Sequence, residues 1–465
     1  MAGTISSLGI GSNVLTSDVI DKLKAADTAG MITPITNKIT LQQQKGQALT
    51  LLNSLLSTFK SSVDALGNDT LYQSRSVSGN TSNVSVSAAS GVSVQSFNIS
   101  NTQLALNDVK ESGAFSSTST TVATGSGTLT LTSGGISYGV AYTSSMTLDE
   151  LKDAINAQAG SKIKASTLQV GTNDYRLVLR SADTGAAQAI TLSDSSGGTL
   201  DTKLYSTYDA TTNPTGVQSI QTAQDASFKY NGITLTRSSN TITDIITGVT
   251  VNLLADSTST ANIAITQDVA AVSSEMTNLV QSYNTLTGQL RDMTTTDVAA
   301  GKVGVFNGDS SINAISREVT RLMTSMDSNG NSLAQYGIDL NESGTMSFNS
   351  ATFTTKYNTD VAASNDFFSN VADDTNKVDG VFTRLGTLMT RYTGSGGVMS
   401  NLTSGSDAAL KSLNANKTRA QALLDARYEA MTARFVQYDS IISKLNNQFS
   451  SLSQQISMAV NGTSN

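Results

Sequence analysis

Acidic side chains are the first residues in this chain that could do chemistry. Asp149, Glu150 and Asp153 fall within one predicted helix, and paired carboxylates share the acid and base roles of glycoside hydrolysis. A structural role is favoured, because the helix dipole stabilises negative charge in the first turn of a helix. Asp373-Asp374 is equally typical of a solvated turn. A two-carboxylate glycosidase therefore ranks only third among the hypotheses below.

An Asp/Asn cluster resembles part of a calcium loop. Asp327, Asn329 and Asn331 occupy its first three ligand positions, but Ser332 replaces the required glycine and Ile338 replaces the bidentate glutamate. Asn and Asp are also typical turn residues. The sequence predicts a turn here and no metal site.

The composition excludes most other enzyme chemistry. The 465 residues contain no His and no Cys, which rules out Ser-His-Asp and Cys-His nucleophiles, zinc bound by His or thiolate, haem bound by His, and disulfides. Gly9-Ile-Gly11 begins like a dinucleotide fingerprint, but it lacks the third glycine and a preceding strand. We predict a protein that is not an enzyme, with no catalytic, cofactor-binding or metal-ligating residues.

Charge and hydropathy limit the partners. The net charge is −7 and only 14% of residues are charged, which argues against nucleic acid and anionic lipid as partners. No uncharged apolar run reaches the length of a membrane span, so no membrane insertion is expected. The first positive charge is Lys22 and no apolar segment follows it, so we expect no cleaved Sec-type signal.

The clearest pattern is a heptad repeat near the carboxyl end. Its two alternating apolar positions hold Leu424, Tyr428, Met431, Phe435, Tyr438, Ile442, Leu445, Phe449, Leu452 and Ile456. With Asp407 as N-cap and Gly462 beyond the end, one helix of roughly 75 Å is predicted at 1.5 Å per residue.

Other helices share this apolar spacing. Thr33 and Pro34 are predicted to begin one that Gly67 ends. Its stripe is continuous from 49 to 66, whereas Lys38, Gln42 and Lys45 interrupt its first half. Another helix follows Asp268 and extends to Met293, and a shorter one runs from Ser17 to about Ala29. The segments 313–323 and 367–391 also have helical spacing.

Two interpretations of the heptad stripe remain open. The helices at 49–66, 268–293 and 407 to about 430 are expected to pack on each other within the chain. These partners are too short to cover the distal half of the last helix, which therefore needs a partner from another subunit. The predicted interface consists of Tyr438, Ile442, Leu445, Phe449, Leu452 and Ile456, with Val19, Ile20 and Leu23 from the short helix.

Between the long helices the apolar period changes from 3.6 to 2, which is typical of antiparallel strands. Thr147-Leu-Asp-Glu150 is a capping box that marks one helix within this region, and Asn231-Gly232 predicts a tight hairpin turn. Ser- and Gly-rich stretches at 112–127 and 193–216 are interpreted as linkers.

The predicted fold is α+β, with long N- and C-terminal coiled-coil helices forming a stem and strand-rich domains inserted between them. The expected domains are terminal helical legs at 1–48 and 431–465, a helical stem at 49–72 and 268–430, a strand-rich domain at 73–111 and 223–267, and an inserted α+β head at 112–222.

Several short motifs resemble those of one known family, and they occur along the chain in the same order as in that family. Ser6-Ser-Leu-Gly-Ile-Gly-Ser12 and Val19-Ile-Asp-Lys-Leu23 closely resemble the N-terminal signature of the bacterial flagellar filament cap family, hook-associated protein 2. This chain also has segments that resemble a repeat found in flagellin and hook-associated proteins, namely Leu151-Lys-Asp-Ala-Ile-Asn156, Tyr175-Arg-Leu and Ser181-Ala-Asp-Thr-Gly185. Four further segments resemble motifs in the C-terminal half of the family's members: Ile263-Ala-Ile-Thr-Gln-Asp268, Ser282-Tyr-Asn284, Gly308-Asp-Ser310 and Leu333-Ala-Gln-Tyr-Gly-Ile338.

The resemblance implies an extracellular protein at the flagellum tip, exported by the flagellar type III system without a cleaved signal. It implies a homo-oligomer of unspecified subunit number that holds exported flagellin and promotes its folding and polymerisation. Hook–filament junction proteins and an export chaperone are the other implied partners, and contact with host surfaces is left open. The alternative function is a flagellin or junction subunit of the filament itself.

Overall fold

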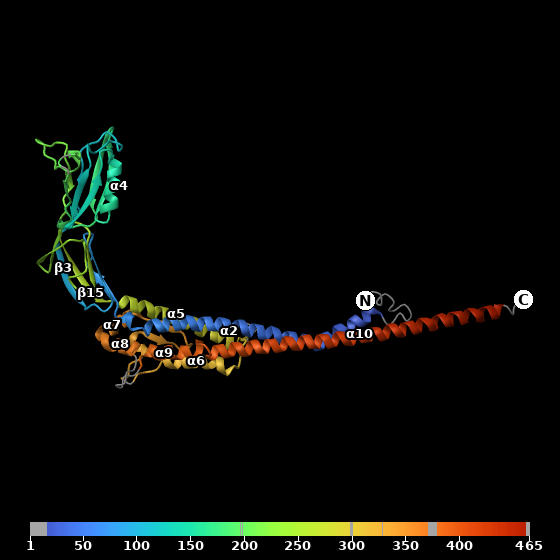
Figure 1. The fold of residues 1–465 in the computed structure, drawn as a ribbon. Coiled ribbons are helices and arrows are strands. Elements are labelled where there is room, and N and C mark those ends of the chain that lie inside the picture. The colour runs from blue at the N-terminus through green and yellow to red at the C-terminus, as the bar shows by residue number, and fades with distance from the viewer. Residues whose placement is uncertain are drawn as a thin grey trace. The chain divides into compact units, whose positions relative to one another are not determined.

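The computed structural model describes residues 16–195, 197, 199–297, 301–327, 329–370 and 379–461. Its contacts divide the chain into two compact units, Met1–Asp69 with Val272–Asn465 and Thr70–Ala271. Long helices from both ends of the chain flank a strand-rich middle, which confirms the α+β class (Figure 1). The finer division into legs, stem, strand-rich domain and head stays a prediction.

The first unit is mainly helical. Its elements are α1 (Ser17–Met31), α2 (Thr33–Leu66), most of α5 (Val269–Thr294), β16 (Thr296–Asp297), β17 (Lys302–Val303), α6 (Ser310–Met323), η3 (Leu333–Tyr336), β18 (Ile338–Leu340), β19 (Met346–Phe348), α7 (Ser350–Thr359), α8 (Val361–Ser369), α9 (Val381–Thr393) and α10 (Val398–Asn461). The first turn of α5 and α3 (Asp69–Tyr72) adjoin the boundary with the second unit.

The predicted stripes of α2 and α5 form the core of the helical unit. The buried residues are Leu49, Leu52, Leu56, Phe59, Val63 and Leu66 on α2 and Val272, Met276, Leu279, Tyr283, Leu286, Leu290 and Met293 on α5. The ring centroids of Phe59 and Tyr283 lie 6.2 Å apart, and Ser282 donates a hydrogen bond to Ser62. The intramolecular bundle is therefore confirmed for these helices.

Two predicted helix boundaries and one predicted helix cap were wrong. Asp407 lies inside α10, which begins at Val398 because Gly394 to Gly397 turn the chain after α9 and Met399 is buried. α2 runs from Thr33 to Leu66 and ends before Gly67 as predicted, but its N-cap is Ile32, in right-handed helical geometry, and not Thr33. The segment 367–391 is not one helix: it contains the end of α8 and most of α9, with 371–378 outside the described residues.

Among its described residues, the second unit contains four antiparallel sheets around two apolar clusters. Its strands are β1 (Arg75–Ser78), β2 (Val84–Ala88), β3 (Gln95–Gln103), β4 (Val109–Glu111), β5 (Gly127–Ser133), β6 (Ile136–Tyr142), β7 (Ile163–Gly171), β8 (Asp174–Ser181), β9 (Thr191–Asp194), β10 (Gln218–Gln221), β11 (Ala226–Tyr230), β12 (Ile233–Arg237), β13 (Thr241–Ile242), β14 (Val249–Leu253) and β15 (Ser257–Gln267). A four-stranded sheet with order β10-β4-β8-β7 and a three-stranded sheet with order β6-β5-β9 contribute to one cluster together with α4 (Leu148–Ala159). The strands β1-β15-β3-β11-β12 and β13-β14-β2 contribute to the other cluster.

Local turn chemistry in this unit is as predicted. Asn231 and Gly232 have φ of 48° and 86°, the left-handed geometry of a tight turn, and they join β11 to β12. The Glu150 carboxylate accepts from the Thr147 backbone N–H at 2.8 Å, while Thr147 Oγ1 accepts from the Glu150 backbone N–H. The capping box at the start of α4 is confirmed.

The Ser- and Gly-rich stretches were wrongly interpreted as linkers. Phe115, Val122 and Ala123 from the first stretch are buried, and so are Leu200 and Leu204 from the second. Apolar residues spaced among the Ser and Gly residues add to the core, so both stretches belong to the compact unit.

The capping box yields a testable stability change. Replacing Thr147 by Ala removes the side-chain acceptor for one backbone amide at the start of α4, and we expect a loss of about 0.5–2 kcal/mol in unfolding free energy. Urea unfolding followed by circular dichroism measures it. Thr147→Ser keeps the hydroxyl and serves as the matched control; an alanine variant as stable as this control contradicts the prediction.

Buried tyrosines predict a loss of stability at alkaline pH. Burial raises the pKa of Tyr283, which donates to or accepts from Thr320 Oγ1 at 3.2 Å, and also raises the pKa of Tyr336. The folded chain therefore holds these phenol protons to higher pH than the unfolded chain does. Their contribution is complete below the unfolded pKa of about 10 and is lost as pH rises through the raised pKa.

Urea midpoints at neutral pH and above pH ~10 measure this loss. Tyr283→Phe is the control, because it removes one of the titrating groups and should flatten part of the alkaline decline. A midpoint that stays constant across this alkaline range contradicts the prediction.

Candidate interface on the carboxyl-terminal helix

The proximal part of the heptad stripe is covered by the chain's own first helix. Ile20 and Ile32 are buried together with Leu424 and Tyr428 in a small apolar cluster. Ala420, Met431 and Phe435 are partly buried against it. The prediction that the terminal helices pair is confirmed for α1 and α10.

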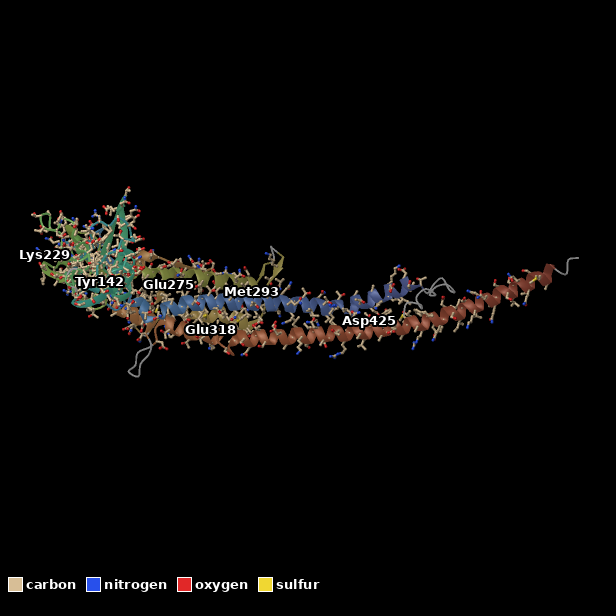
Figure 2. All side chains as sticks on the ribbon, turned by 45° about the horizontal axis from the view of Figure 1, so that its top comes forward. Tyr142, Lys229, Glu275, Met293, Glu318 and Asp425 are labelled. Carbon is tan, nitrogen blue, oxygen red and sulfur yellow. The ribbon has the colours of Figure 1, made fainter. Side chains whose placement is uncertain are left out.

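Polar contacts surround this cluster. Tyr428 Oη donates to Asp27 Oδ2 at 2.8 Å, and Arg427 pairs with the same oxygen at 3.1 Å. Lys24 Nζ lies 2.8 Å from Asp425 Oδ1, and this ammonium lowers the pKa of the Asp425 carboxyl (Figure 2 labels Asp425). Burial and, after it, contact with the Asp27 carboxylate raise the pKa of Tyr428. α1 and α10 therefore match in both charge and apolar surface.

The distal stripe lies exposed on α10. The exposed fractions are 55% for Tyr438, 47% for Leu445, 70% for Phe449, 51% for Leu452 and 55% for Ile456, whereas Ile442 is half-buried. In Figures 1 and 2 no other described helix lies beside the end of α10. We call the residues from Tyr438 to Ile456 on this face the distal seam.

The three candidates on α1 divide between two environments. Val19 and Leu23 are 38% and 46% exposed and remain available to another chain. Ile20 is only 6% exposed, because it packs into the cluster with Leu424 and Tyr428. Within one chain Ile20 is therefore covered by α10, while Val19 and Leu23 are not: apolar residues at 19, 20 and 23 point over a wide arc of the helix, and the contact with α10 takes only part of that arc.

One exposed apolar residue was missed. Ile441 is 53% exposed beside the distal seam. It falls outside the two heptad positions used for the prediction, although its position directly before Ile442 widens the apolar face on one flank. A helical projection of all apolar residues would have included it.

The distal seam has very few charges. No charged residue occurs from 445 to 461, where the polar positions hold only Ser, Asn and Gln. A helix packed on this face is therefore held by apolar burial, without ionic pairs that would select one register.

The acidic candidates have structural partners. Asp149 and Asp153 both pair with Lys152, and Glu150 caps α4. Asp327 accepts hydrogen bonds from the Asn329 and Asn331 backbone amides, which is the predicted turn. Among the described residues, no cluster of three or more acidic side chains could hold a metal ion, and no helix is long and apolar enough to span a membrane.

Two candidates cannot be placed. The Gly9-Ile-Gly11 motif and Asp373-Asp374 both lie outside the described residues.

Comparisons with known proteins decide the family. The N-terminal model of flagellar hook-associated protein 2 matches residues 12–108 and its C-terminal model matches 223–447, with a flagellin hook IN motif at 128–183 between them. Flagellar hook-associated protein 2 of Escherichia coli K12 is 30% identical over 468 residues, covering 97% of this chain and 98% of the relative. This chain belongs to the flagellar hook-associated protein 2 family.

Other members agree with the fold. The Campylobacter jejuni flagellar hook-associated protein 2 is 34% identical over 79% of this chain, which spans 65% of that longer relative. A crystal structure of the D1-D2-D3 domains of the E. coli flagellar cap protein FliD superposes with a TM-score of 0.59 at 28% identity, covering 77% of this chain and 99% of that one. The hook-associated protein 2 family is a structural family of flagellar caps, and membership favours the cap over the alternative of a filament subunit.

The C-terminal family model ends within the distal seam. The C-terminal family model stops at 447, so Phe449, Leu452 and Ile456 lie beyond it. Their role has to be argued from exposure and chemistry.

Proposed function

We propose that this cap protein acts as a homo-oligomer at the flagellum tip, where it holds exported flagellin and promotes its folding and polymerisation. The observation that supports the proposal is the distal seam, which the described chain leaves exposed. Full burial of a Leu or Phe side chain contributes about 1.5–3 kcal/mol, so a partner helix over several seam residues is stabilised substantially. The predicted interface is Tyr438, Ile442, Leu445, Phe449, Leu452 and Ile456 with Val19, Ile20 and Leu23; of these, Ile20 is covered by α10 within the single chain.

The low charge of the seam fits an assembly factor that releases its contacts. Coiled coils choose partner and register through flanking charges and single buried polar residues. Here the flanks are mostly uncharged, so a bound helix moves to another register without losing ion pairs. The mechanism is mechanical, and no bond is made or broken.

Other proposed partners follow from location and exposure. The same apolar stripe needs cover before export, which we assign to an export chaperone in the cell. Hook–filament junction proteins are the first surface that a newly exported cap meets. Export by the flagellar type III system without a cleaved signal belongs to the same proposal.

A complementation assay tests the function. Cells that lack a cap are expected to secrete unpolymerised flagellin, and expression of this chain from a plasmid should restore filaments. Loss of a filament subunit instead leaves no flagellin to secrete. Normal filaments in cells that lack this chain would sink the proposal.

A further inference from the structure

The contact between α1 and α10 is small and self-contained. Among the described residues, Ile20, Ile32, Leu424 and Tyr428 are the buried members of this contact, and they form a cluster of their own. The rest of the helical unit keeps its core in the α2 and α5 stripes described above. Loss of the α1 contact would therefore leave that core in place.

The ion pairs across this contact are half-exposed. Lys24 faces Asp425 and Asp27 faces Arg427, with exposed fractions between 34% and 60% for these side chains. Surface pairs of this kind add little stability but do select a partner of matching charge. The surface of α10 around Tyr428 thus has a demonstrated occupant, an α1 helix with its Lys24 and Asp27.

The connection to α2 can bend. α1 ends at Met31, Ile32 interrupts the helix assignment, and α2 begins at Thr33. Pro34 has no N–H for the carbonyl of Gly30 four residues earlier, and proline in this position is a common cause of kinks. Gly30 has no neighbouring heavy atom within 4 Å of the place where a Cβ would lie, whereas Ile32 is buried with Leu424 and Tyr428 and would have to move together with α1.

We propose that α1 exchanges between copies, so that α1 of one chain packs on α10 of another through the same residues. The inference rests on the proposed function, in which copies gather along α10. Exchange of a terminal element preserves every contact it makes within one chain and adds a link between chains at low cost. The surface is Leu424, Asp425, Arg427 and Tyr428, and the partner is α1 of a second copy.

Because the chain has no cysteine, introduced thiols report the exchange. One chain carries Lys24→Cys and a second, with a tag that changes its mass, carries Asp425→Cys. The two are unfolded together, refolded as mixed oligomers and treated with a short bismaleimide. Mass spectrometry identifies the 24–425 product between chains. We expect roughly tenfold more of it than in the control pair, because thiols held in contact react at millimolar effective concentration.

The control pair is Lys22→Cys with Asp425→Cys. Lys22 lies on the same helix, but its side chain projects about 200° around the helix axis from that of Lys24. Crosslinking that results only from two chains lying near each other should therefore give similar yields for both pairs. A chain with both Lys24→Cys and Asp425→Cys measures the contact within one molecule. Crosslinking only within this double variant, while the mixed oligomers are intact, overturns the exchange but not the proposed function. Absence of oligomers overturns both, and failure of the double variant to crosslink at all overturns the contact and the exchange.

Discussion

Leu445→Asp with Leu452→Asp is expected to abolish assembly. The two side chains lie one heptad apart on the distal seam and are 47% and 51% exposed in the single chain. In an interface each leucine would contribute about 1.5–3 kcal/mol, and each buried unpaired carboxylate would oppose association further. The mass of the purified assembly, from analytical ultracentrifugation, should fall to that of one chain, while circular dichroism shows the strands intact.

The matched control places the same charges on the other side of the helix. Asn447→Asp with Gln454→Asp adds two carboxylates at the same spacing on exposed polar positions of α10. This variant should assemble like the unmodified chain, which would separate loss of the seam from simple repulsion. Intact oligomers from the leucine variant would refute the interface.

Phe59→Ala is expected to destabilise the helical unit by about 3–5 kcal/mol, the range for removal of a buried phenylalanine. Phe59 is fully buried on α2, and its ring lies 6.2 Å from that of Tyr283 on α5. The substitution leaves a cavity between these helices that neighbouring side chains fill only in part. Urea unfolding followed by far-UV circular dichroism should show an earlier transition for the helical unit.

Leu51→Ala provides the comparison on the same helix. Leu51 is 45% exposed, so its truncation removes little buried surface and should cost less than about 1 kcal/mol. Equal losses for the two variants would show that α2 owes its stability to helix propensity and not to packing against α5.

Strongly periodic segments were predictable from local pattern. The helical spacing after Asp268 correctly predicted α5, on which Val272, Met276 and Leu279 are buried, and the period of two between the long helices correctly predicted strands such as β5, on which Leu129 and Leu131 are buried. Each pattern reflects one dominant force, burial of a face repeated at the period of the backbone. The start of α10 was missed because Asp407 is a good N-cap by type, whereas the actual start depends on the glycines before Val398 and the burial of Met399.

The candidate interface was predictable only in part. The heptad pattern identified Tyr438 to Ile456, and the length of the other helices indicated that they would not cover it. The pattern did not separate Ile20 from Val19 and Leu23, because all three fit one amphipathic face. Separately, the Ser- and Gly-rich composition around Phe115 and Leu200 predicted linkers, because the residues that pack on these two side chains are distant in sequence.

By itself, the sequence determined which classes of chemistry are absent, the periods of the main helices and strands, and the apolar stripe along the last helix. These follow from residue type and spacing alone. Only the tertiary structure decided which part of that stripe is buried and which part is exposed to solvent, because the boundary depends on how far α1 extends along α10. Packing between residues some four hundred positions apart sets that limit, and no local pattern contains it.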